Sequence, residues 1–94
     1  MADDSADDGG VRCWLVERTY TDKGLVSLVY ATADGERVLR RERSPEILQR
    51  TGGVTAATTV DPDGLEPVAD ADDRERYATE AARMADRHDP DETV

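Results

Sequence analysis

The chain has 94 residues, with 22 acidic and 12 basic side chains and a net charge of -10 at pH 7. This length accommodates one domain. No apolar run approaches the roughly 18 residues of a membrane-spanning helix, and the single cysteine, Cys13, excludes an intrachain disulfide and a cysteine-based zinc cluster. The acidic first residues lack the basic and apolar regions of a signal peptide, so we expect a soluble, cytoplasmic protein with no membrane contact.

The acidic excess predicts the solvent in which this protein works. Eleven of its twelve basic residues are arginine, and Lys23 is the only lysine. Acidic groups at this density repel one another, and concentrated salt screens the repulsion because the Debye length falls to about 3 Å near 1 M. The composition therefore predicts a halophile protein. An acidic disordered chain is the alternative reading, but residues 11–60 are too rich in apolar and β-branched residues for it.

Residues 11–43 predict three strands in an antiparallel meander. Val11 to Tyr20 alternates with a period of two, and its two predicted faces are Val11, Cys13 and Leu15 and, opposite them, Arg12, Trp14, Val16 and Arg18. Leu25 to Ala33 is apolar on both faces, which is typical of a central strand covered on two sides. Turns at 21–24 and at Asp34-Gly35 join these strands to a third, from Glu36 to Arg43.

The middle of the chain predicts a short helix and a fourth strand. Ser44 and Pro45 are typical of a helix N-cap and first position, and the helix should last about two turns. Val54 to Val60 has high β propensity, and its partner can be the first or the third strand. We expect residues 65–68 to be a loop over the core.

The last part of the chain predicts the longest helix, from Asp72 to His88, with Tyr77, Ala81 and Met84 in its apolar stripe. The order β-β-β-α-β-α indicates an α+β fold: a four-stranded, largely antiparallel sheet with the C-terminal helix packed on one face. We expect a single domain over residues 11–88, between an acidic flexible tail at 1–10 and a second flexible tail at 89–94.

The third predicted strand carries the only basic patch of this acidic chain. Planar guanidinium groups bind phosphate and stack on bases, and two aromatic residues lie on neighbouring strands. The candidate residues for a nucleic-acid or phosphate-ligand site are Arg37, Arg40, Arg41, Arg43, Arg50, Trp14 and Tyr30. The alternative is structural, with these arginines paired to Glu17, Glu36, Glu42 or a second subunit and protecting a sheet edge.

Other patterns favour structure over chemistry. Asp61 and Asp63 resemble the start of a calcium-binding loop, but the later ligands are missing, so we expect a turn. Cys13 alternates with apolar residues and His88 ends the last helix, and neither has an expected catalytic partner. No phosphate-binding glycine loop or nucleophile elbow occurs. We therefore expect no catalytic residue, no metal and no cofactor.

Three blocks of the sequence resemble a family of small uncharacterised proteins of halophilic archaea. They are Val-Arg-Cys-Trp-Leu-Val-Glu-Arg-Thr-Tyr (11–20), Tyr-Ala-Thr-Ala-Asp-Gly-Glu-Arg-Val-Leu-Arg (30–40) and Glu-Arg-Tyr-Ala-Thr-Glu-Ala-Ala-Arg-Met-Ala-Asp-Arg-His-Asp-Pro (75–90). The resemblance covers nearly the whole predicted domain. It implies a source and a domain size, and it carries no activity.

These patterns favour a small interaction module that is not an enzyme. A thin core and a strand apolar on both faces leave apolar surface that another protein would cover, so we expect self-association as a homodimer or a place in a larger assembly. The alternative function is binding of nucleic acid or a phosphate ligand through the arginine-rich strand.

Overall fold

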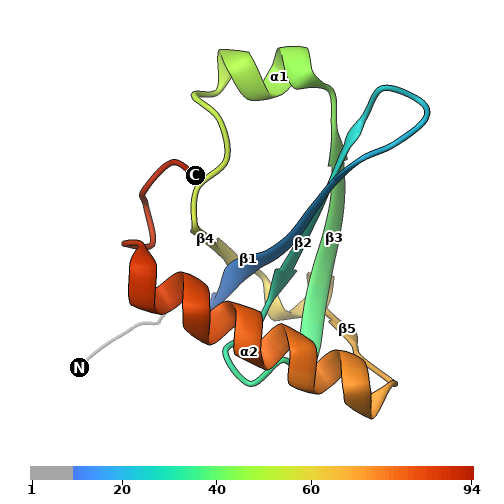
Figure 1. The fold of residues 1–94 in the computed structure, drawn as a ribbon, viewed down its shortest axis with the longest axis vertical. Helices are drawn as coiled ribbons and strands as arrows, with labels where there is room; N and C mark the ends of the chain where they lie inside the picture. Colours follow the sequence, from blue (N-terminus) through green and yellow to red (C-terminus); the bar gives the residue numbers. More distant parts are fainter. Residues whose placement is uncertain (1–9) are drawn as a thin grey trace.

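The protein folds as one antiparallel sheet with a long helix across one face (Figure 1). The computed structural model describes residues 10–94, so residues 1–9 of the predicted N-terminal tail lie outside the described part. The sheet has five strands in the order β4-β1-β2-β3-β5. The elements in chain order are β1 (Val11–Tyr20), β2 (Val26–Ala31), β3 (Arg37–Arg43), α1 (Pro45–Arg50), β4 (Ala57–Val60), the 3-10 turn η2 (Pro62–Gly64), β5 (Glu66–Pro67) and α2 (Ala71–Arg87).

The predicted α+β class is confirmed, but the predicted number of strands is wrong. β5 lies in the stretch expected to be a loop, and its two residues pair with the start of β3. A two-residue strand has no period that a sequence can reveal, and Pro67 cannot donate a ladder hydrogen bond. The fourth strand begins at Ala57, later than the predicted Val54, and pairs with β1.

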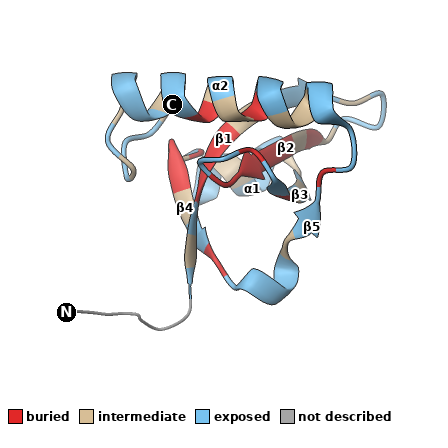
Figure 2. Cartoon of the chain, turned by 90° about the horizontal axis from the view of Figure 1, so that it is seen from below, coloured by how far each residue is buried: buried red, intermediate tan, exposed pale blue. Residues whose placement is uncertain are grey.

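Both faces of the sheet are buried, as the apolar character of β2 predicts. α2 covers one face, and its buried positions point toward the strands (Figure 2). The buried residues between α2 and the sheet are Val29, Ala31, Val38, Val68 and Tyr77, with Trp14, Ala56, Ala57 and Ala81 beside them. The opposite face carries a second cluster, which consists of Cys13, Leu15, Val26, Leu28, Tyr30, Val54 and Val60. α1 and the chain that follows it lie on this second side.

The turn between β2 and β3 packs closely against α2. Gly35 has a φ of +73°, and a Cβ at this position would contact the main-chain oxygen of Arg74 and the main-chain nitrogen of Ala78. The Asp34 carboxylate accepts hydrogen bonds from the Thr32 hydroxyl and from the main-chain N–H of Glu36. Glycine is therefore needed at position 35 for both the turn and the helix contact.

Residues 89–94, predicted to be a flexible tail, form backbone hydrogen bonds with the segment that precedes β4. The Val94 N–H donates to the Val54 oxygen at 2.8 Å, and the Ala56 N–H donates to the Glu92 oxygen at 2.8 Å. These bonds satisfy buried backbone groups at the sheet edge. The sequence of the segment is short and polar, without the alternation that would predict such pairing.

Candidate anion-binding site

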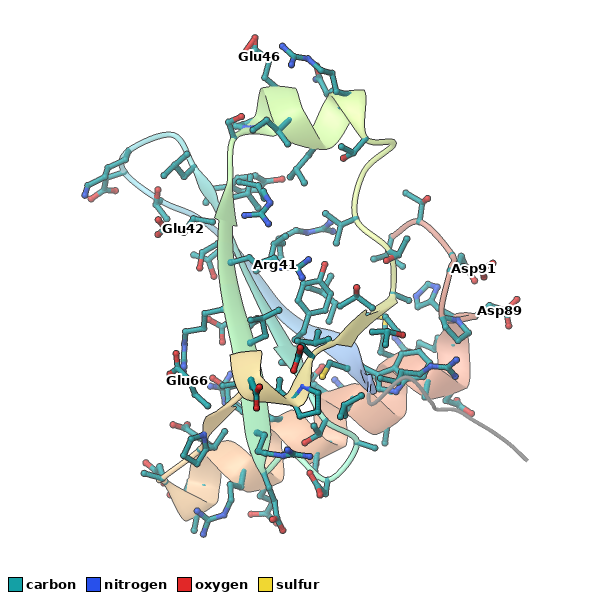
Figure 3. The ribbon with its side chains drawn as sticks, turned by 180° about the vertical axis from the view of Figure 1, so that it is seen from behind. Arg41, Glu42, Glu46, Glu66, Asp89 and Asp91 are labelled. Atoms are coloured by element: carbon teal, nitrogen blue, oxygen red, sulfur yellow. The ribbon has the colours of Figure 1, made fainter. Side chains whose placement is uncertain are left out.

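A pocket of about 250 Å³ lies on the face of the sheet away from α2. β2 and β3 form one side of it, and α1 and the residues up to Thr58 form the other. The polar lining consists of Tyr30, Arg41, Arg43, Thr51, Thr55 and Thr58, and the aliphatic lining of Leu28, Ile47, Leu48 and Val54. In Figure 3 the Arg41 side chain extends from β3 toward the segment that leads to β4. The pocket thus combines guanidinium and hydroxyl groups with an apolar wall.

The period of β3 decides which of its arginines reach this pocket. Arg41 lies opposite Leu28 of β2, on the pocket side, and Arg43 follows two residues later on the same side. Arg40 is out of phase with them, and its guanidinium lies 3.6 Å from the Glu66 carboxylate. Because successive side chains of a strand point to opposite faces, the predicted basic patch is divided between the two faces.

Three other residues predicted for the site, Arg37, Arg50 and Trp14, lie outside the pocket lining. Arg37 is exposed at the start of β3, and Arg50 is exposed in the last turn of α1. Trp14 is buried with Ala81 beneath α2, whereas Tyr30 is buried in the opposite face of the sheet. The two aromatic rings predicted to stack on bases are therefore both inside the protein and on different sides of the sheet.

The two pocket arginines have no carboxylate partner among the residues that the structure describes. Arg43 donates to the main-chain oxygen of Glu42 at 2.9 Å. Glu17, one of the partners considered from the sequence, instead pairs with Arg76 of α2 at 3.2 Å. Within residues 10–94, Arg41 and Arg43 therefore place positive charge beside the pocket without an ion-pair partner, although the chain as a whole carries a net charge of -10.

Tyr30 adds a buried hydroxyl to the pocket lining. The residue is 4% exposed, and its hydroxyl forms no hydrogen bond within residues 10–94. The neighbouring Arg18 and Arg43 donate instead to the main-chain oxygens of Val94 and Glu42. The guanidinium carbon of Arg41 lies 5.7 Å from the centre of the Tyr30 ring, within cation–π distance. Burial raises the pKa of the Tyr30 hydroxyl, and the charges of Arg41, Arg43 and Arg18 oppose that rise. The protonated hydroxyl can donate a hydrogen bond to an anion.

Arg18 reaches this side of the sheet through a β-bulge that the alternation of β1 does not predict. The register between β1 and β2 shifts between Leu15 and Glu17. A bulge adds one residue to a strand and reverses the alternation after it. Arg18, predicted to share a face with Trp14, therefore lies opposite Leu28 on the pocket side of the sheet. The bulge is visible only in the pairing register of β1 with β2, because the residue types around it do not distinguish a bulge from a regular strand.

In the part of the chain that the structure describes, the remaining reactive groups lie apart from one another. Cys13 is buried, and burial raises the pKa of its thiol. His88 contacts Glu92 at 2.8 Å near the end of the chain. Asp61 accepts a hydrogen bond from the N–H of Asp63 at 3.0 Å and forms a turn. Within residues 10–94, no three His, Cys, Asp or Glu side chains are grouped so that they could hold a metal ion.

The fold and the pocket define a small α+β protein with a basic pocket on an acidic chain. The chain belongs to a family of unknown function, DUF7967, whose family model matches residues 6–94. No curated protein and no solved structure matches the chain. None of the helices in the described part is long and apolar enough to cross a membrane. Family membership covers nearly the whole chain and carries no activity, so the function must be inferred from the pocket.

Proposed function

We propose that this protein is a small non-enzymatic binding module that holds a phosphate-bearing ligand in the pocket between β3 and α1. The observation that carries the proposal is the position of Arg41 and Arg43, which line the pocket without a carboxylate partner in the described part of the chain. Guanidinium groups bind phosphate oxygens through paired, charge-assisted hydrogen bonds.

The charge of the whole chain strengthens this argument. A net charge of -10 repels anions from most of the surface. A concave site with two guanidinium groups is therefore locally positive on a negatively charged protein. It favours an anionic group that is small enough to fit inside. Of the three threonines in the lining, Thr51 and Thr55 already donate their hydroxyl protons to the main-chain oxygens of Ile47 and Ala57. The hydroxyl of Thr58 has no hydrogen bond within residues 10–94 and can donate to such a ligand.

A binding role agrees better with the described side chains than catalysis does. The Cys13 thiol is buried on the pocket side of the sheet, and its raised pKa favours the protonated form, which is a poor nucleophile. His88 caps the end of α2 and contacts Glu92 at 2.8 Å, and no hydrogen bond joins it to Cys13 within residues 10–94.

Calorimetric titration of the intact protein with inorganic phosphate tests the proposal. Arg41→Gln and Arg43→Gln should each weaken binding about ten-fold or more, because each removes a charge-assisted contact worth roughly 1.5–3 kcal/mol. Arg50→Gln is the matched control: it removes the same charge from an exposed position outside the pocket, and it should leave the affinity within two-fold. Equal affinities for all three variants would contradict the proposal.

A second candidate function is self-association or binding of another protein, as the sequence favours. Among residues 10–94, two large apolar side chains are exposed, Tyr20 at 75% and Ile47 at 45%. Tyr20 ends β1 and Ile47 belongs to α1, and these elements lie at the same end of the molecule (Figure 1). Sedimentation in molar KCl tests this candidate: a dimer that Tyr20→Ser dissociates would support it, and a monomer at all concentrations would oppose it.

We also propose a cytoplasmic location in a salt-adapted organism. The support is the composition: an acidic excess of this size, with almost no lysine, suits a solvent in which salt screens the repulsion between carboxylates. The expected consequence is a fold whose stability rises with the concentration of KCl.

A further inference from the structure

The buried hydroxyl of Tyr30 distinguishes this pocket from a simple basic patch. A hydroxyl removed from water without a hydrogen-bond partner destabilises a protein, and most buried polar groups are satisfied. Tyr30 is 4% exposed, it lines the pocket, and its hydroxyl has no partner within residues 10–94. An anion bound between Arg41 and Arg43 would accept a hydrogen bond from it.

The volume and the two-sided lining of the pocket limit the ligand that can enter. At about 250 Å³, the pocket is smaller than the roughly 300–1,000 Å³ typical of drug-sized ligand sites. The arginines form one part of the lining, and Leu28, Leu48 and Val54 form an aliphatic part. A compact ligand with one anionic group and a small apolar portion fits both parts.

A nucleic-acid chain fits these observations poorly. Proteins that bind single strands present aromatic rings on which bases stack and a positive groove along the backbone. Trp14 and Tyr30 are buried on opposite faces of the sheet, and the chain as a whole carries a net charge of -10. A polyanion longer than the pocket would meet repulsion from that negative charge.

We infer that the pocket binds a compact phosphomonoester, with Arg41, Arg43 and the Tyr30 hydroxyl on its terminal phosphate and the aliphatic wall against its small organic part. This inference rests on the proposed phosphate-binding function and specifies its ligand class. Tyr30 is the residue that gives the site its preference for an oxygen-rich anionic group that can accept its hydrogen bond.

The test uses phenyl phosphate, inorganic phosphate and an oligothymidylate as probes of the intact protein in molar KCl. Phenyl phosphate should bind about ten-fold more tightly than inorganic phosphate, because only its ring contacts the aliphatic wall. Tyr30→Phe should weaken phenyl phosphate binding about ten-fold, while the melting temperature of the unliganded protein should not fall, because no hydrogen bond within residues 10–94 is lost.

Tyr77→Phe is the matched control for the loss of a hydroxyl. Tyr77 is equally buried, at 4% exposure, but it packs between α2 and the other face of the sheet and does not line the pocket. Its replacement should leave the affinity for phenyl phosphate within two-fold. A decrease as large as that of Tyr30→Phe would overturn the assignment of Tyr30 to the ligand.

Other outcomes separate this inference from the proposed function. If both phosphates bind equally well and their binding depends on Arg41, the inference fails and the proposed function stands. If the oligothymidylate binds more tightly than phenyl phosphate, the inference of a compact ligand is also wrong. If no probe binds, or if binding does not depend on Arg41 and Arg43, the proposed function fails together with the inference.

Discussion

The guanidinium carbon of Arg41 lies 5.7 Å from the centre of the Tyr30 ring. The contact positions a charged group over a buried ring at the pocket lining, and both side chains come from adjacent strands, β3 and β2. A guanidinium that is oriented before the ligand arrives loses less side-chain freedom on binding. The packing of the sheet therefore prepares the binding group.

Replacement of Arg41 by lysine should show how much of the phosphate affinity depends on the planar shape of the guanidinium group and how much on its charge. Arg41→Lys keeps the positive charge but loses the planar fork and the stacking on Tyr30, so affinity for inorganic phosphate should fall about ten-fold, or about 1.4 kcal/mol. Arg40→Lys, on the other face of β3, should bind as the unmodified protein does. Calorimetric titration of both variants measures the effect. An Arg41→Lys protein with full affinity would show that charge alone is sufficient.

Gly24 and Gly35 have similar φ angles, but replacement by alanine should reduce the free energy of unfolding by different amounts at the two positions. Gly35→Ala places its Cβ against the main chain of Arg74 and Ala78, at a φ of +73°, and should destabilise the protein by about 2–5 kcal/mol through strain and overpacking. Gly24→Ala, at a φ of +77°, meets nothing within 4 Å, and should cost about 1–2 kcal/mol. Urea unfolding of both variants checks the difference. Equal losses of stability would show that the turn and α2 are not in close contact.

The Asp34 carboxylate predicts a pH-dependent contribution to stability. Hydrogen bonds from the Thr32 hydroxyl and from the Glu36 N–H hold the pKa of Asp34 below its usual 3.8. A carboxyl group with a lower pKa in the folded state stabilises that state above the pKa of the unfolded chain, and the contribution disappears as the pH falls through the folded-state pKa. Asp34→Asn should therefore be less stable than the unmodified protein at about pH 7, and the difference should shrink below about pH 4.

Urea unfolding at several pH values measures this difference. Asp86→Asn, which removes a carboxylate from the exposed face of α2, controls for the change in net charge. A difference between Asp34→Asn and the unmodified protein that stays constant down to about pH 3 would oppose the role given to the turn.

The acidic composition predicts that salt stabilises the fold. With a net charge of -10, repulsion between carboxylates should weaken as the Debye length falls from about 10 Å at 0.1 M to about 3 Å at 1 M KCl. The melting temperature should therefore rise steadily over this range. A melting temperature that does not change with KCl would contradict both the role of the acidic surface and the proposed salt-adapted source.

Much of the fold could be predicted because its elements have strong local patterns. β1 has the predicted bounds, α1 begins at the predicted Pro45, and α2 begins one residue before the predicted Asp72. β5 and the pairing of residues 89–94 could not be predicted, because they depend on which strand edge lies nearby. The same holds for the bulge before Glu17, which brings Arg18 to the pocket side.

The candidate site was predictable only in part. The period of two in β3 is visible in the sequence and separates Arg41 and Arg43 from Arg40. The pocket itself depends on the chain after α1, whose aliphatic and threonine residues approach β2 only in three dimensions. The burial of Trp14 and Tyr30 also results from tertiary packing, and it removes the stacking surface that the sequence suggested.

The most direct test of the central claim is the map of backbone amide chemical shifts as inorganic phosphate is titrated into isotopically labelled protein. The proposed site predicts saturable changes at Tyr30, Arg41 and Arg43 and in residues 51–58, with no comparable changes around Arg40 and Arg50. Changes centred on Arg40 or Arg50, or no saturable change at any amide, would contradict the account.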